Sequence, residues 1–139
     1  MLSRLPLAAL AALAAACGED QLVCVEPDLT CAPLYAPTWA NVVTSTIVPK
    51  CGASGCHTAA ARRGGLVLDD PATAYDHLVL GGYVVPGDAA CSELTERIYS
   101  TSASLRMPRG TPLSTAEACA VARWVAAGAP GPTTAREVP

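Results

Sequence analysis

The chain has 139 residues and a formal net charge of −3, and only 15% of its residues are charged. Because no stripe of basic residues runs along it, we do not expect it to bind nucleic acid. Aromatic residues make up 4% of the chain and phenylalanine is absent. Side chains alone therefore build a thin core, and we expect disulfides, a metal or a bound cofactor to reinforce it.

Residues 1–16 predict a secretory signal peptide. Arg4 precedes an apolar run that ends in small residues and is too short to span a bilayer. The sequence Leu-Ala-Ala-Ala-Cys at 13–17 is similar to a bacterial lipobox, so we expect lipid on Cys17 and attachment to a membrane surface. A plain cleaved signal without lipid is the alternative. Both interpretations predict export, to the periplasm or to a lipid-anchored position on the outer membrane.

The next two segments differ in character. Residues 17–37 hold three prolines and no apolar periodicity, which predicts an irregular tether. Thr38 is a good N-cap for a helix whose apolar residues recur at helical spacing as far as Ile47. Pro49 is expected to end that helix.

The most informative motif follows this helix directly. Residues 51–57 read Cys-Gly-Ala-Ser-Gly-Cys-His, with a histidine immediately after the second cysteine. Covalent attachment of a c-type haem requires this order, because the two thiols add to the porphyrin vinyl groups and the histidine becomes an iron ligand. Four residues separate Cys51 from Cys56, where the usual motif has two. The extra residues must loop out, and the glycines and serine among them are expected to make this loop compliant.

Three further helices are predicted along the chain. An Asp-Pro pair starts one over 70–80, and an aspartate starts another over 88–100. A Ser-x-x-Glu capping box starts the last, over 114–127, before a glycine and a proline. We therefore expect an all-α domain over 38–130, followed by a disordered tail at 131–139.

Two residues are candidates for a second axial iron ligand. Met107 is the only methionine after Met1, and it lies in a polar loop, directly before a proline that is expected to stiffen that loop. A thioether opposite a histidine favours ferrous iron and raises the reduction potential. His77 is the only histidine besides His57. We interpret it as a surface or half-buried helix residue, with a bis-histidine site as the alternative.

The seven cysteines of the chain can all be assigned. Lipid on Cys17 and haem on the two motif cysteines leave four. These divide into a local Cys24–Cys31 pair and a distant Cys91–Cys119 pair, whose members fall on the inward faces of the last two predicted helices. Disulfides suit the oxidising compartment that the signal peptide implies.

The motifs of residues 38–130, taken in order, resemble the monohaem cytochromes c, and most closely exported bacterial lipoprotein domains with a C-x4-C-H haem motif. Besides residues 51–57, the matching sequences are Gly-Gly-Leu at 64–66, Val-Pro-Gly-Asp at 85–88, Ser-Glu-Leu at 92–94, Arg-Met-Pro-Arg-Gly at 106–110 and Trp-Val-Ala-Ala-Gly-Ala-Pro at 124–130. The resemblance implies a cytochrome c-like fold of about four helices with long loops, in which the first and last helices cross beside a haem pocket. It also implies thioether bonds at Cys51 and Cys56 and iron ligation by His57 and Met107.

We therefore expect an exported electron-transfer protein with one covalently bound haem c, its iron held by His57 and Met107. Six-coordinate iron leaves no open position for a substrate, so we do not expect an enzyme. The expected partners are redox proteins and, through the lipid, a membrane, and the protein is expected to be a monomer. The main alternative is a haem-free lipoprotein with a Cys51–Cys56 disulfide, acting as a surface or interaction module. A zinc site that adds His77 to the motif fits known zinc spacings poorly.

Overall fold

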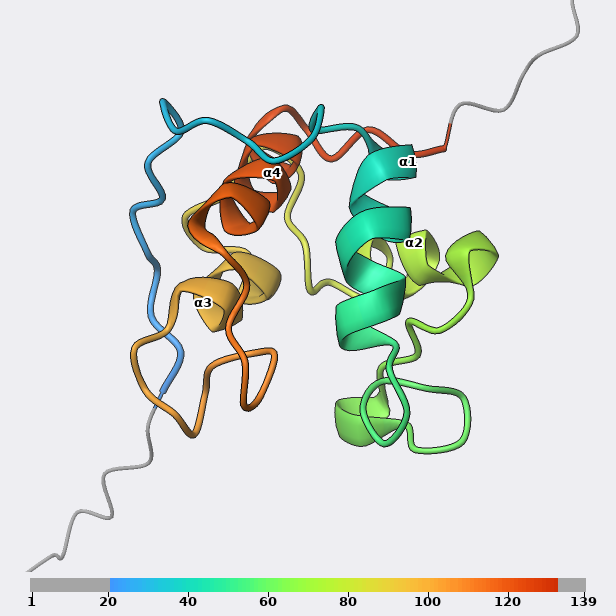
Figure 1. The fold of residues 1–139 in the computed structure, drawn as a ribbon. Coiled ribbons are helices and arrows are strands. Elements are labelled where there is room, and N and C mark those ends of the chain that lie inside the picture. The colour runs from blue at the N-terminus through green and yellow to red at the C-terminus, as the bar shows by residue number, and fades with distance from the viewer. Residues whose placement is uncertain (1–20, 133–139) are drawn as a thin grey trace, which may run out of the picture.

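Residues 21–132 are described here from a computed structural model of the chain. The elements are α1 (Trp39–Val42), η1 (Val43–Cys51), η2 (Arg63–Gly65), α2 (Pro71–Val79), α3 (Glu93–Tyr99) and α4 (Thr115–Ala126), joined by long loops (Figure 1). Within this part of the chain there is no strand, so the prediction of an all-α fold is confirmed. The predicted signal peptide, Cys17 and the tail beyond residue 132 lie outside the described residues.

The first helix starts where predicted but runs further. The Thr38 side chain accepts a hydrogen bond from the amide of Asn41, and α1 continues without a break into η1, which is a π-helix. The prediction that Pro49 ends the helix is wrong, because Pro49 lies inside η1. A π-helix pairs each amide with the carbonyl five residues back, as Gly52 does with Ile47, and this wider turn leaves room for the proline ring. The helix therefore continues as far as Cys51.

Three aromatic rings join three helices at one end of the core. The Trp39 ring of α1 lies 5.2 Å from the Tyr75 ring of α2 and 5.3 Å from the Trp124 ring of α4. Both polar tips are satisfied, since the Tyr75 hydroxyl donates to the carbonyl of Ala129 and the Trp124 indole donates to that of Pro130. Edge and tilted ring packing of this kind adds about 0.5–1.5 kcal/mol per pair beyond simple burial.

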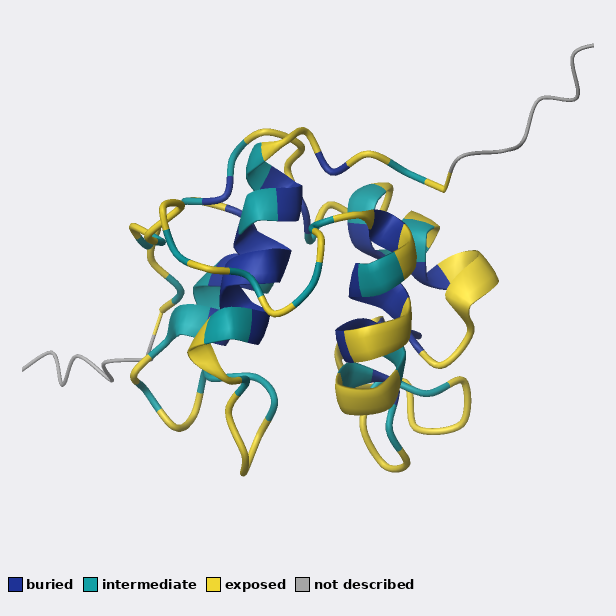
Figure 2. Ribbon diagram, turned by 45° about the horizontal axis from the view of Figure 1, so that its top comes forward, coloured by how far each residue is buried: buried dark blue, intermediate teal, exposed yellow. Residues whose placement is uncertain are grey.

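The helix formed by α1 and η1 packs against α4 in the opposite direction. Trp39, at the start of α1, contacts Trp124 near the end of α4, and Lys50, near the end of η1, pairs with Glu117 in the first turn of α4. α4 is the most buried element, and Figure 2 shows its dark blue surface facing the rest of the core. The Ser114–Glu117 capping box that starts α4 is present as predicted.

The third predicted helix starts later than expected. Instead of beginning at Asp88, α3 begins at Glu93 with Ser92 as its N-cap. The Asp88 carboxylate accepts from the amide of Cys91, three residues on, and this local bond forms a turn where a helix was predicted. Cys91 is therefore exposed in a loop and does not lie on the inward face of a helix.

The predicted disulfide pairing is also wrong. The structure joins Cys24 to Cys91 and Cys31 to Cys119, where the sequence suggested Cys24–Cys31 and Cys91–Cys119. Residues 21–34 contain no helix or strand and pass along α3 and α4 (Figure 1). An extended segment carries each of its cysteines to a different element, so neither the nearest pairing nor the helix-to-helix pairing forms.

The segment 21–37 is thus held against the domain and is not a free tether. Besides the two disulfides, the amide of Val25 donates to Ala90 and that of Leu34 to Ala116. Among the described residues, no helix is both long and apolar enough to cross a membrane.

Candidate functional site

A cavity of about 880 Å³ lies between the motif loop and the α3 side of the domain. This volume falls within the range of roughly 300–1,000 Å³ that is typical of small-molecule and cofactor sites. Cys51, Cys56 and His57 line one wall, and Met107 lines the cavity as well. The structure therefore brings all four predicted haem-binding residues to one cavity, although about fifty residues of sequence separate the motif from the methionine.

Much of the remaining wall is apolar, and its residues come from the segment before α2, from α2 and from α3. These residues are Leu66, Leu68, Leu78, Leu94 and Ile98. An apolar wall with a few polar groups suits a flat, largely hydrophobic ligand.

Two backbone bonds close the motif loop. The amide of His57 donates to the carbonyl of Cys51 at 3.1 Å, and the amide of Cys56 donates to that of Ala53 at 3.0 Å. The loop therefore turns back on itself between the cysteines, whose thiols are free of disulfide bonds. Cys51 is half-buried and Cys56 is exposed.

The two glycines of the loop act differently from one another. Gly55 has φ +78°, in the left-handed region, so it supplies the conformational freedom that the sequence suggested. Gly52 has φ −80°, which any residue adopts. A Cβ at Gly52 would overlap the carbonyl group of Leu68 and lie 2.8 Å from Cα of Asp69. Gly52 is thus required for close packing and not for flexibility.

His57 is oriented by its own backbone surroundings. Its Nδ1 lies 2.8 Å from the carbonyl oxygen of Arg63. Because a carbonyl only accepts, Nδ1 carries the ring proton, and the lone pair on Nε2 is left for a metal. The amide of Leu68 also donates to the carbonyl of His57, so both the ring and the backbone of His57 are fixed.

Met107 is held by the end of α3. Its amide donates to the carbonyl of Arg97 at 2.9 Å, and its side chain is half-buried at the cavity. His77, the other candidate ligand, lies on α2 and is not among the residues that line this cavity. Over residues 21–132, no group of three or more His, Cys, Asp or Glu side chains is arranged to hold a metal ion.

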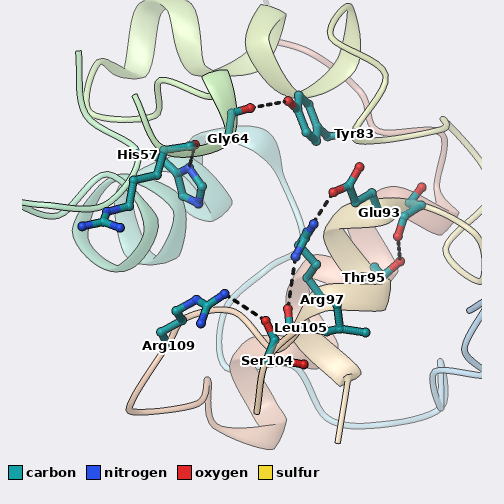
Figure 3. Close-up of polar contacts among 11 residues, drawn as sticks. His57, Gly64, Tyr83, Glu93, Thr95, Arg97, Ser104, Leu105 and Arg109 are labelled. Carbon is teal, nitrogen blue, oxygen red and sulfur yellow. Dashed lines mark hydrogen bonds and ion pairs between the residues drawn. The ribbon is translucent and has the colours of Figure 1, made fainter. Parts of the chain in front are cut away.

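The cavity also carries more positive than negative charge. Lys50, Arg63, Arg97 and Arg109 line it together with one acid, Glu93. Arg97 pairs with Glu93 at 2.8 Å and donates to the carbonyl of Leu105, whereas Arg109 donates to the carbonyl of Ser104 (Figure 3).

Neither Arg97 nor Arg109 was predicted from the sequence to line the cavity. The available signals were weak. Arg97 lies three residues after Leu94 on the same helix, and Arg109 lies two residues after Met107.

The two motif thiols have different environments. The pKa of Cys51 is raised to about 12, mainly by burial and to a smaller extent by the neighbouring Cys56, while Lys50 acts in the opposite direction. At neutral pH, Cys51 is therefore a protonated thiol. Cys56 is open to solvent beside it.

Residues 54–109 match the family model described as Planctomycete cytochrome C. The matched stretch includes Cys56, His57 and Met107 and ends at Arg109, and it supports a cytochrome c-like domain in this chain. The comparisons with curated proteins and with solved structures gave no match. At this coarse level, the family match suggests haem binding and electron transfer.

Proposed function

We propose that the protein is an exported electron carrier with one c-type haem covalently bound in the cavity between the motif loop and α3. The observation that carries this proposal is the gathering of Cys51, Cys56, His57 and Met107 around one largely apolar cavity of about 880 Å³. The same cavity lies largely within the part of the chain that matches the cytochrome family.

The residues that line the cavity fit a c-type haem. Cys51 and Cys56 would form the two thioether bonds, Nε2 of His57 would ligate the iron, and the sulfur of Met107 would be the second axial ligand. Haem supplies reversible one-electron chemistry when bound. The chain fixes the His57 ring through Arg63, excludes water with its apolar wall and presents a sulfur ligand that favours the reduced form.

The arginines that line the cavity would pair with the acidic groups of a bound haem. A haem carries two propionate groups, and guanidinium groups pair well with carboxylates. Arg97 and Arg109 lie across from His57 (Figure 3), and both line the cavity together with Met107. They are the groups we assign to the propionates.

Export and anchoring follow from the sequence of residues 1–17. The two disulfides suit an oxidising compartment and so support export to the periplasm or the outer membrane. The lipobox-like sequence at 13–17 is the support for lipid on Cys17. We propose redox proteins as partners, a monomeric state and no enzymatic activity, since two axial ligands leave the iron without an open position.

A second candidate is a haem-free lipoprotein that acts as a surface module. The observation that favours it is the pair of disulfides, which already connects the N-terminal segment to α4 and to the loop before α3. In that case Cys51 and Cys56 would form a third disulfide.

The two candidates are separated by expressing the protein with a c-type haem maturation system and extracting it with acid and acetone. Haem that stays with the polypeptide and gives a two-thioether pyridine haemochrome spectrum supports the electron carrier. A colourless protein with Cys51 joined to Cys56 supports the surface module, provided that a C-x-x-C-H cytochrome matures in the same cells.

A further inference from the structure

Arg63 contacts the motif loop on both sides of Cys56. Its side-chain Nε donates to the carbonyl of Gly55 at 2.6 Å, and its own carbonyl lies 2.8 Å from Nδ1 of His57. Gly55 directly precedes Cys56 and His57 directly follows it. One residue therefore holds both neighbours of the second motif cysteine.

The position of Arg63 is itself fixed. Arg63 begins the short helix η2, which starts after Arg62 in the left-handed conformation, at φ 44°. The hydroxyl of Tyr83, beyond α2, donates to the carbonyl of Gly64 at 3.1 Å (Figure 3). The turn that carries Arg63 is thus tied to another part of the domain and can serve as a support for the loop.

The long spacing of the motif creates a need for such a support. The segment between Cys51 and Cys56 has four residues, and glycine has the largest conformational freedom of any residue in the unfolded and loosely held chain. Within the described residues, two hydrogen bonds join this segment to residues outside the motif. The amide of Gly52 donates to the carbonyl of Ile47 and continues η1 into the start of the loop. The bond from Arg63 to Gly55 holds the other end of the loop, next to Cys56, and it comes from a later part of the chain.

We propose that the Arg63 side chain is a positioning residue for haem attachment, which clamps the elongated loop at Gly55 so that Cys56 and His57 keep the register of a C-x-x-C-H motif. This inference rests on the proposed function, since it assigns a role in loading the same cavity. It predicts that the Arg63 side chain increases haem attachment when four residues separate the two cysteines and has no effect when two residues separate them.

The test compares Arg63→Gln in two chain backgrounds. The first is the native chain, and the second lacks Ala53 and Ser54, so that it reads Cys-Gly-Gly-Cys-His. Arg62→Gln is the matched control, because it removes the same charge one residue away and leaves the bond to Gly55 intact. Both products are measured, namely the fraction of protein with two thioether bonds and the fraction with one.

The expected result is a loss of the two-thioether product in the native chain with Arg63→Gln, by roughly fivefold, as for one typical hydrogen bond. The same substitution leaves the shortened chain unchanged, and Arg62→Gln has no effect in either. An equal loss in both backgrounds would overturn the proposal, because Arg63 would then act independently of loop length. An unchanged product ratio in the native chain would overturn it as well.

A second measurement uses the haem-free protein with the motif thiols reduced. The amides of Cys56 and His57 are hydrogen-bonded inside the loop, so their hydrogen exchange reports its opening. We expect Arg63→Gln to speed both by about three- to tenfold, with exchange in α4 unchanged as proof of folding. If the native chain takes up no haem, the proposed function fails, and this exchange experiment alone decides whether Arg63 clamps the loop.

Discussion

Lys50 and Glu117 form an ion pair at 2.5 Å that joins the end of η1 to the first turn of α4. Glu117 is buried, with 7% of its side chain exposed, whereas Lys50 is 41% exposed. The carboxylate also accepts from the hydroxyl and the amide of Ser114. Because Lys50 directly precedes Cys51, this pair anchors the start of the haem motif to the last helix.

We predict that Glu117→Gln lowers the free energy of unfolding by about 1–2 kcal/mol at pH 7. Glutamine keeps the capping box, so the loss reports the charge. Burial raises the pKa of Glu117, but the bond to Lys50 and the two bonds from Ser114 outweigh it, and the net pKa lies below its ordinary value of 4.5. The stabilising contribution is therefore present above pH 4.5 and is lost as the pH falls through the lower folded-state pKa.

The measurement is chemical denaturation of both proteins between pH 3 and pH 7. The stability difference should be constant near neutrality and shrink at the acidic end. A difference that stays the same at every pH would mean that the glutamate acts through packing and not through its charge.

Cys51 and Cys56 are predicted to differ in reactivity in the haem-free protein. Burial raises the pKa of Cys51 to about 12, and the thiolate is the reactive form. At pH 8 we expect iodoacetamide to modify Cys56 at least about 100-fold faster than Cys51. Tandem mass spectrometry of tryptic peptide 51–62 separates the two sites, and unfolding in urea should equalise the rates. Equal rates in the folded protein would show that Cys51 is not shielded.

Gly52 is predicted to tolerate no side chain. A Cβ there would overlap the backbone of Leu68. The amide of Leu68 also donates to the carbonyl of His57. Backbone atoms cannot move aside as a flexible side chain can. We therefore expect Gly52→Ala to lower the free energy of unfolding by about 1–3 kcal/mol and to reduce the yield of haem-loaded protein. Ser54→Ala, in the exposed part of the same loop, is the control and should be neutral.

Much of the fold follows from local signals in the sequence. Thr38, Asp70 and the Ser114–Glu117 box each cap a helix where the pattern predicts one, because a cap depends on side chains within a few residues of the backbone it serves. The errors lie at Asp88 and Pro49. At Asp88 a turn bond to Cys91 replaces the first turn of the helix, and at Pro49 a π-helix accommodates the proline.

Features that depend on long-range packing could not be predicted from the sequence. The disulfide pairing depends on the path of residues 21–34 across the domain. The sequence of this segment has no apolar periodicity from which its path could be predicted. Likewise, the contact of Arg63 with Gly55 depends on η2 folding back onto the motif. By contrast, the residue types and order of Cys51, Cys56 and His57 predicted their role from the sequence alone, as did the isolated Met107. The structure places all four at one cavity.

The disulfides Cys24–Cys91 and Cys31–Cys119 are predicted to be the ones that peptide mapping finds. They close loops of 67 and 88 residues, and loops of this size remove unfolded-state entropy worth about 4–5 kcal/mol each in the loop-closure model. Replacing either pair by serines should lower the free energy of unfolding by up to about that amount. A Cys24–Cys31 peptide in the non-reduced digest would contradict the observed path of the N-terminal segment.

Met107→Ala is predicted to lower the reduction potential of the haem-loaded protein by on the order of 100 mV, because a thioether ligand stabilises the ferrous state. The visible spectrum of the ferric form should change with the loss of the sulfur ligand. Leu105→Ala is the matched control, since Leu105 lies on the same loop but lines a different pocket, beside residues 21–25. An unchanged spectrum and potential would remove Met107 from the coordination sphere, and a change with His77→Ala instead would assign that position to the histidine of α2.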